Sequence, residues 1–193
     1  EYYLEQKYGK PLINTDNKVG ATKEEIAEAF KFYKMLTDSG AVVSAKDRAG
    51  AGNYPDDQNP LWMNGELGGI LNWNTMIGAY GDMLKEGDTL VAGDFLTGIG
   101  EHKSAYVKIN MTLAINKNTK HPKEAARFLN FMLSDPEAAK ILGTVRGLPL
   151  NKSAYAVLEK EGLTTGPIAE GLEKALNFAG PKKSPYIEDE RTR

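Results

Sequence analysis

The sequence predicts a mixed α/β or α+β domain in which helices dominate. Amphipathic segments with recognisable start and stop residues recur along the 193 residues, and each predicts a helix. Short apolar segments between them are typical of buried strands. The chain contains no internal repeat and no low-complexity tract. The order of elements therefore favours packed layers of helices and short strands, and leaves α/β and α+β both open.

Helix signals in the first half of the chain are clearest around Thr22. Residues 1–9 are expected to form a helix that stops at Gly9. Thr22 and Glu25 have the spacing of a capping box, in which each side chain bonds a free backbone N–H at a helix start. The helix that follows has one apolar stripe, made of Ile26, Phe30, Tyr33 and Leu36. Residues 60–64 predict a short helical turn, and residues 75–84 predict a helix with Asn74 as its cap.

Proline marks two helix starts in the second half. Pro122 follows His121, and Pro136 follows Asp135, so both prolines fall at the first helical position, where no N–H is needed. The first of these helices has an apolar stripe of Ala125, Phe128, Leu129 and Met132. Asp135 is the expected cap of the second helix. Two more helices are expected over residues 152–161 and 167–178.

Three segments predict strands. Residues 68–73 and 89–92 are short apolar runs, and residues 106–115 alternate strictly between apolar and other side chains. Residues 44–60 and 93–105 are rich in glycine and polar residues and are expected to be loops. A loop as long as 44–60 is often functional.

Composition excludes several classes of protein. The chain has no cysteine, so it has no disulfide, cysteine-ligated zinc site or thiol nucleophile. A net charge of −2 gives no long-range attraction to nucleic acid or anionic lipid. No apolar run approaches the roughly 20 residues that span a bilayer. The chain starts in what resembles the middle of a helix, so we expect a fragment of a longer protein; an intact small protein with a processed N-terminus is the alternative.

Candidate catalytic groups are few. His102 and His121 lack the spacing of a zinc site, and no serine lies in a nucleophile-elbow pattern. Asp56 and Asp57 form an adjacent acidic pair in the long loop, which leaves a carbohydrate hydrolase as one alternative. We therefore expect no metal site and no cofactor.

Trp73 is the most informative single residue. It ends the predicted strand 68–73 and is flanked by Asn72 and Asn74. A tryptophan ring stacks well on the apolar face of a sugar, and neighbouring amides can bond its hydroxyl groups. The alternative is a core tryptophan at the end of a strand. Trp62, nearby, is expected to pack the short turn that contains it.

Four stretches of the chain resemble the extracellular solute-binding proteins of family 1, the sugar-binding components of ABC transporters. The stretches are Tyr8-Gly9-Lys10-Pro11-Leu12 with the helix up to Leu36; Asn64-Gly65-Glu66-Leu67-Gly68-Gly69-Ile70 with Trp73; residues 106–115 with Lys120 to Leu129; and Asp135-Pro136-Glu137-Ala138-Ala139 with residues 143–151. The resemblance is to the C-terminal half of such a protein and covers nearly the whole chain. Gly68 and Gly69 depart from the family pattern, which more often has Ala and Met there.

The resemblance implies a helix-rich periplasmic-binding-protein-like type II fold with short strands in a mixed sheet, as a fragment of a two-lobe protein. By position, residues 1–92 would belong mainly to the C-terminal lobe. Residues 93–145 would hold a hinge crossing and the N-terminal-lobe strand and helices. Residues 146–193 would return to the C-terminal lobe and end in an extended tail. A fragment that lacks part of its packing is also expected to be prone to self-association.

The same resemblance implies a function. A sugar or oligosaccharide would bind between the lobes, and the permease subunits of an ABC importer would recognise the closed form. The protein would be a monomer at the extracellular face of the membrane or in the periplasm, attached to the membrane only through a lipid anchor on a preceding N-terminal part. The expected ligand residues are Trp73, Asn72, Asn74, Tyr106, Lys108, Arg146, Asn53 and Tyr54. Arg146 has an alternative role as a structural ion pair near the hinge.

Two other functions stay open from the residues alone. One is the carbohydrate hydrolase that would use Asp56 or Asp57. The other is an interaction domain that binds no small ligand. The scarcity of catalytic groups and the aromatic–amide cluster around Trp73 favour non-enzymatic binding.

Overall fold

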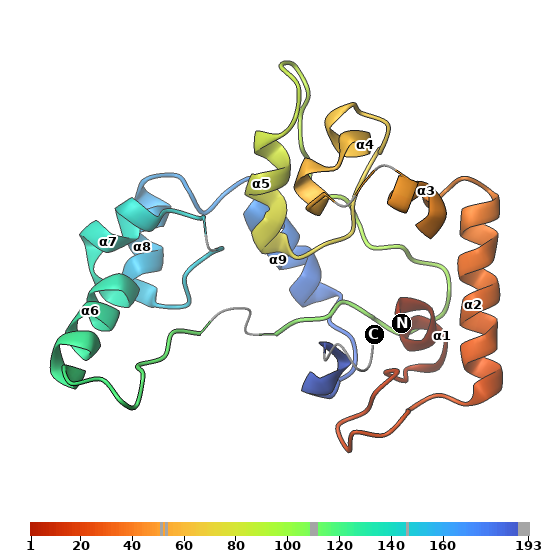
Figure 1. Ribbon diagram of the computed structural model, residues 1–193, viewed down its shortest axis with the longest axis horizontal. Coiled ribbons are helices and arrows are strands. Elements are labelled where there is room, and N and C mark those ends of the chain that lie inside the picture. The colour runs from red at the N-terminus through yellow and green to blue at the C-terminus, as the bar shows by residue number, and fades with distance from the viewer. Residues whose placement is uncertain (51, 53, 109–111, 146, 189–193) are drawn as a thin grey trace. The chain divides into compact units, whose positions relative to one another are not determined.

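A computed structural model describes the chain except residues 51, 53, 109–111, 146 and 189–193. Its described elements are all helical (Figure 1). They are α1 (Tyr2–Tyr8), α2 (Lys23–Asp38), α3 (Ala45–Gly50), η1 (Asp56–Gln58), α4 (Pro60–Met63), η2 (Asn74–Met76), α5 (Ile77–Asp82), α6 (Pro122–Ser134), α7 (Pro136–Leu142), α8 (Lys152–Lys160), α9 (Pro167–Asn177) and η3 (Pro185–Glu188).

Contacts divide the chain into two compact units. Unit 1 contains residues 1–53, 94–107 and 174–193, and unit 2 contains residues 54–93 and 108–173. The division of the chain into lobes that the sequence suggested, with boundaries at 92 and 145, stays a prediction. Among the described residues, no helix combines the length and the apolar character that a bilayer crossing requires.

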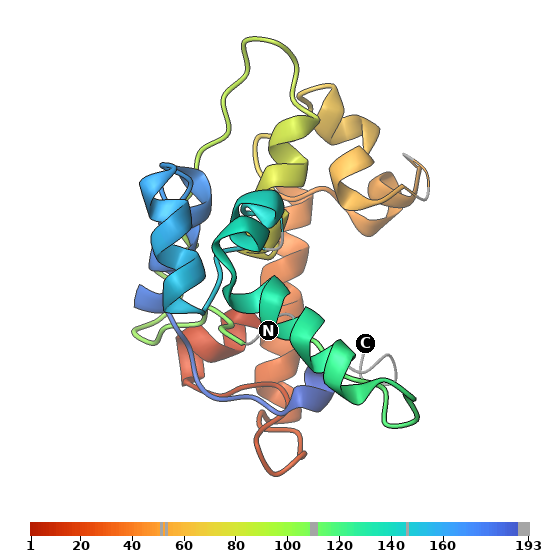
Figure 2. The ribbon, with the colours of Figure 1, turned by 90° about the vertical axis from the view of Figure 1, so that its left-hand side faces the viewer.

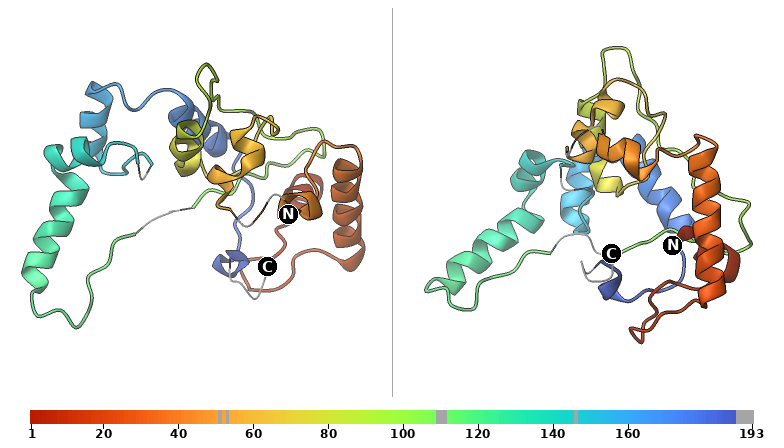
Figure 3. Two further views of the ribbon diagram at one scale, coloured as in Figure 1. Left: turned by 45° about the horizontal axis from the view of Figure 1, so that its top comes forward. Right: turned by 45° about the vertical axis from the view of Figure 1, so that its right-hand side comes forward.

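In unit 1, α1 lies against α2 (Figures 1 and 3). α1 ends before Gly9, the predicted stop, and Gly9 has a left-handed φ of 65°. The capping box of Thr22 and Glu25 is present at the start of α2, which confirms the clearest helix signal of the sequence. The two helices meet through Tyr3 and Phe32, whose ring centroids lie 4.8 Å apart.

Polar residues of α1 are part of the core of unit 1. Glu5 and Gln6 are buried beside Leu4. Gln6 Nε2 donates to the carbonyl of Leu96 at 2.7 Å and to Ser104 Oγ at 3.1 Å. Next to Ser104, the backbones of Ala105 and Ala179 form an isolated parallel bridge. These bonds connect three segments of unit 1 that are far apart in the sequence.

In unit 2, α6, α7 and α8 pack together (Figure 2). Pro122 and Pro136 occupy the first turns of α6 and α7, and Asp135 Oδ1 accepts the N–H of Glu137 at 2.9 Å, as predicted. Leu158 of α8 is fully buried in this group. The predicted helices at 152–161 and 167–178 correspond to α8 and α9.

Two predictions of local structure were wrong in detail. The segment 44–60 is not a plain loop, because α3 and η1 lie within it. Ser44 caps α3, since its Oγ accepts the N–H of Asp47 at 3.1 Å. Asn74 does not cap α5: it begins η2, and the preceding Trp73 makes no side-chain cap bond.

None of the three predicted strands is formed in the described residues. Residues 68–73, 89–92 and the described parts of 106–115 have no ladder of backbone hydrogen bonds; the isolated bridges pair Ile13 with Val19, Ala105 with Ala179 and Val145 with Gly147. A strand needs a second segment alongside to satisfy its N–H and C=O groups. Alternating apolar residues indicate which side chains prefer burial, but they do not supply that partner.

Candidate functional site

The short segment from Asn72 to Met76 carries the candidate site in unit 2. Both polar atoms of the Asn72 side chain make hydrogen bonds that hold this segment. Its Oδ1 accepts the backbone N–H of Trp73 at 2.7 Å, and its Nδ2 donates to the phenol of Tyr80 at 2.7 Å. Tyr80 is a buried residue of α5. The backbone of Trp73 is therefore connected to a helix through a single amide.

Trp62 also contacts Tyr80 of this helix. Its Nε1 donates to the carbonyl of Tyr80 at 3.1 Å, and the two rings meet edge to face with centroids 5.6 Å apart. Trp62 is buried, and Asn59 caps the short helix α4 that contains it. The prediction that Trp62 is a packing residue is confirmed. Tyr80 is thus held by Trp62 and in turn holds Asn72.

Trp73 itself is only half-buried, so it does not belong to the buried core. Lys108 lies over its ring, with the ammonium nitrogen 4.7 Å from the ring centroid. This distance is within the roughly 6 Å over which a cation is attracted to the face of an indole. The contact joins two predicted ligand residues that are far apart in the sequence.

Two glycines allow neighbouring segments to approach the site. Gly147 has φ of 85°, and a Cβ there would lie 2.8 Å from Thr75 Cγ2. A Cβ on Gly171 of α9 would lie 3.0 Å from Ile77 Cδ1 and 3.7 Å from Asn74 Cβ. Larger side chains at these positions would push the segments apart. The turn near Gly147 and the first part of α9 therefore flank the 72–77 segment.

The structure brings together four of the eight predicted ligand residues, namely Asn72, Trp73, Asn74 and Lys108. Tyr54 also belongs to unit 2, and the residue is 54% exposed. Tyr106 belongs to unit 1, where the ammonium of Lys183 lies 4.6 Å from its ring centroid. Burial, with smaller contributions from the negative charges of Glu188 and Glu1, raises the pKa of Tyr106. Asn53 and Arg146 lie outside the described residues.

Sequence reasoning missed the residues that support the site. Tyr80 is the clearest example, because it accepts one hydrogen bond through its phenol and another through its carbonyl. In the sequence it is one more aromatic residue of a predicted helix. The available signal was the asparagine Asn72 at the start of the turn-forming segment before that helix. Its hydrogen-bond partner, Tyr80, is set by the fold and cannot be read from the sequence.

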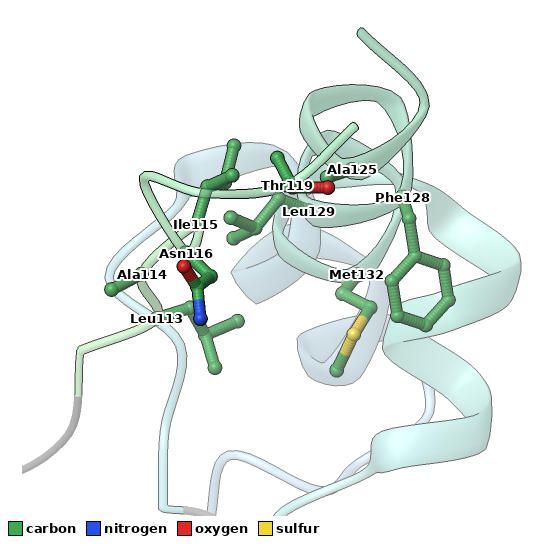
Figure 4. Close-up of a pocket in the computed structure, with 9 residues that line it drawn as sticks. All are labelled: Leu113, Ala114, Ile115, Asn116, Thr119, Ala125, Phe128, Leu129 and Met132. Atoms are coloured by element: carbon green, nitrogen blue, oxygen red, sulfur yellow. The ribbon is translucent and has the colours of Figure 1, made fainter. Parts of the chain in front are cut away.

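An apolar cavity of about 350 Å³ lies elsewhere in unit 2 (Figure 4). One wall comes from segment 113–119, which ends in a turn and is visible in Figure 3 as it leads to α6, and the other comes from the predicted stripe of α6. Its lining residues are Leu113, Ala114, Ile115, Asn116, Thr119, Ala125, Phe128, Leu129 and Met132. With only an amide and a hydroxyl among these side chains, the cavity is poorly suited to a sugar, whose hydroxyl groups each need a partner. Among the described residues, no group of three or more His, Asp or Glu side chains could hold a metal ion.

Solved structures that are similar to this chain include periplasmic solute-binding proteins. One from Pectobacterium atrosepticum is 31% identical with a TM-score of 0.83; the match covers 98% of this chain and 48% of that one. An oligogalacturonide-binding protein from Yersinia enterocolitica, in complex with saturated digalacturonic acid, is 30% identical with a TM-score of 0.81 over 98% and 48% of the two chains. A designed cysteine esterase is 30% identical with a TM-score of 0.68 over the same shares. The chain thus spans about half the length of the structures it matches.

The family model of the bacterial extracellular solute-binding proteins matches residues 1–139. The chain belongs to this family. The resemblance found in the sequence is confirmed, and so is the fold class: a helix-rich part of a periplasmic-binding-protein fold.

Proposed function

We propose that this protein is the sugar- or oligosaccharide-binding component of an ABC importer, and that Trp73 stacks on the bound sugar. The observation that carries the proposal is the placement of Trp73: its indole is half-buried, its backbone N–H is bonded to Asn72, which in turn bonds Tyr80, and Asn74 follows it in the chain. Membership of the solute-binding family supports a binding role. The oligogalacturonide ligand of the Yersinia relative supports a carbohydrate.

The residues around Trp73 have different parts in this proposal. Both ends of the Asn72 amide already have partners, so Asn72 acts mainly by positioning Trp73. Asn74, next along the chain, is the proposed partner of sugar hydroxyl groups. Tyr106, Lys108, Arg146, Asn53 and Tyr54 remain candidates for other positions along the cleft or hinge.

The wider setting is part of the same proposal. Ligand binding would favour a closed arrangement of two lobes, which the permease subunits recognise, because the closed form makes more contacts with the sugar. The location would be the periplasm or the extracellular face of the membrane, where the protein would be a monomer. Periplasmic relatives support this location, and a lipid anchor is the proposed attachment in the second case.

An enzymatic function is the second candidate. A cysteine esterase is among the similar structures, but this chain has no cysteine and cannot use that nucleophile. A hydrolase would have to use carboxylates such as Asp56 or Asp57, which lie on η1. Incubation with oligosaccharides separates the two: a binding protein leaves the ligand intact, whereas a hydrolase releases shorter products.

Thermal shift with a panel of mono- and oligosaccharides tests the proposal, on protein expressed from its complete gene. A ligand that binds only the folded state at 100 times its Kd adds about 2.7 kcal/mol of stability and raises Tm. We expect such a shift for at least one sugar, its loss in Trp73→Ala, and its partial retention in Trp73→Phe, which keeps an aromatic face. A shift that survives in Trp73→Ala would mean that Trp73 does not contact the ligand, and the proposed stacking would be wrong.

A further inference from the structure

We propose that Gly171 of α9 is a positioning residue of the candidate site: it lets α9 lie against the 74–77 turn and thereby holds Asn74 where it can bond a sugar hydroxyl group. This rests on the proposed function, in which Asn74 contacts the ligand. Gly171 and Asn74 both belong to unit 2, although they are far apart in the sequence. The proposal adds a second part of the chain to the support of the site.

Gly171 lies inside α9, where glycine is an unfavourable residue. Glycine loses more conformational freedom than alanine when a helix forms, so an interior glycine weakens the helix. It is useful where another segment comes too close for a side chain. The structure shows such an approach, because a Cβ at position 171 would lie 3.0 Å from Ile77 Cδ1. Carbon atoms pack best about 3.5–4.0 Å apart, so alanine at this position would push against Ile77.

Ile77 connects this contact to Asn74. Asn74 begins η2, and the backbone N–H of Ile77, which directly follows η2, donates to the carbonyl of Asn74. A push on Ile77 therefore moves the turn that carries Asn74. The Cβ of Asn74 itself would lie 3.7 Å from a Cβ at position 171, which is an ordinary contact distance. Alanine at position 171 thus fits against Asn74 and lies too close only to Ile77.

Gly147 provides a second close approach to the same turn. Its φ is 85°, and a Cβ there would lie 2.8 Å from Thr75 Cγ2. Thr75 follows Asn74 in the chain, so two later segments meet this turn at neighbouring residues. Alanine at Gly147 would also strain a left-handed backbone, whereas Gly171 has the backbone of an ordinary helical residue. Gly171 is therefore the position at which the support of Asn74 can be tested without backbone strain.

Calorimetric titration with digalacturonic acid, the ligand in the Yersinia structure, and with maltose, an uncharged disaccharide, tests the proposal. Protein from the complete gene is compared with Gly171→Ala, with Ile77→Val and with the double variant. Ile77→Val removes Cδ1, the atom that the new methyl group would meet, so the double variant keeps the alanine without the close contact. Gly78→Ala is the matched control, because Gly78 is a helical glycine of α5 and a Cβ there would meet no atom within 4 Å.

We expect Gly171→Ala to weaken binding of a disaccharide that the wild type binds by about 3- to 10-fold, the range of one neutral hydrogen bond. Ile77→Val and Gly78→Ala should stay within about 2-fold of the wild type, and the double variant should return to within about 2-fold. The Tm of ligand-free Gly171→Ala should stay within about 3 °C of the wild type, because alanine favours the helix while the close contact opposes it. A general loss of structure would instead lower Tm and affinity together.

Three results would overturn the inference. If Gly171→Ala binds as tightly as the wild type, α9 does not position Asn74, and the sugar site stands without this support. If Gly171→Ala binds weakly and the double variant is not restored, the loss does not pass through the contact with Ile77. If the wild-type protein binds neither disaccharide, this inference fails, and the thermal-shift panel shows separately whether the proposed function fails with it.

Discussion

Two lysines in this molecule lie over aromatic rings at nearly equal distances but in very different surroundings. Lys183 lies 4.6 Å from Tyr106 in unit 1, and Lys108 lies 4.7 Å from Trp73 in unit 2. The side chain of Lys183 is 2% exposed and ion-pairs with Glu5 and Glu1. Lys108 is only half-buried. The same contact between a lysine and an aromatic ring is buried in unit 1 and partly exposed to solvent in unit 2.

Burial decides the energetics of the first cluster, which consists of Lys183, Glu5, Glu1, Tyr2 and Tyr106. Glu5 is fully buried, and its Oε2 has no hydrogen-bond donor among the described residues. Burial therefore raises the pKa of Glu5 to about 7, even though the ion pair with Lys183 opposes the rise. Such a pair contributes little net stability but is costly to break on one side only.

The largest expected effect comes from breaking that pair. Lys183→Met should destabilise the fold by about 3–5 kcal/mol at pH 8, because it leaves the carboxylate of Glu5 buried without a counter-charge. Urea unfolding followed by circular dichroism measures the loss. Lys182→Met is the matched control, since the neighbouring Lys182 is exposed and should change stability by less than about 0.5 kcal/mol.

The double variant Glu5→Gln/Lys183→Met sharpens this result. Removing both charges should cost less than the sum of the two single losses, because neither charge is left alone. If the three losses were additive, the ion pair would not be the source of the effect, and the packing of the lysine stem against Tyr106 would explain it instead.

A pH dependence is the second expected effect. The raised pKa of Glu5 means that the folded state holds a proton on this carboxyl more tightly than the unfolded state does. The stability from this proton is fully present below about pH 4.5 and is lost as pH rises toward about 7. We expect a fall on the order of 2 kcal/mol between pH 5 and pH 8.

Glu5→Gln tests the assignment of that pH dependence. The amide does not titrate, so the slope of stability against pH should disappear over this interval, whatever the absolute stability of the variant. An equal slope in the wild type and in Glu5→Gln would assign it to another group. The nearby Glu28 cannot imitate it, because its contacts with Lys7, Tyr8 and Tyr3 lower its pKa to about 2, outside the interval.

The third expected effect concerns the support of Trp73. Asn72→Ala and Tyr80→Phe each remove the 2.7 Å hydrogen bond between these side chains, and each should cost about 1 kcal/mol. In a double-mutant cycle the two changes should be partly non-additive, because both remove this bond, whereas only Asn72→Ala also removes the bond to the Trp73 N–H. Both should also weaken sugar binding if Asn72 positions Trp73. Full additivity would show that the two residues act independently.

The sequence predicted the helices and their caps well, because those signals are local. The capping box at Thr22 and the cap at Asp135 each depend on residues within one turn, and both are present. The strand predicted over residues 106–115 is not formed in the described parts of that segment, for the opposite reason. Its alternating pattern is local, but a strand forms only beside a partner, and no neighbouring segment in the described residues supplies one.

Of the candidate site, only Trp73 and the two asparagines beside it could be predicted from the sequence. Trp73 and its two asparagines are adjacent in the sequence, so their chemistry could be recognised there. The role of Tyr80 and the approach of Gly147 depend on contacts between distant segments, which no single-sequence pattern contains. Glu5 shows the same limit, because a glutamate on a short helix would ordinarily be placed on the surface.

The smallest expected effect is the one that separates the two lysines most directly. Lys108→Met should change the stability of the ligand-free protein by less than about 1 kcal/mol, since a cation over a half-exposed ring contributes about 0.5–1 kcal/mol. This is several-fold less than the expected loss in Lys183→Met, although the ring distances differ by only a tenth of an ångström. Urea unfolding of both variants under one condition makes the comparison. Equal losses would mean that Lys108 is a structural residue like Lys183; a small loss would mean that the two contacts differ in energy because they differ in burial.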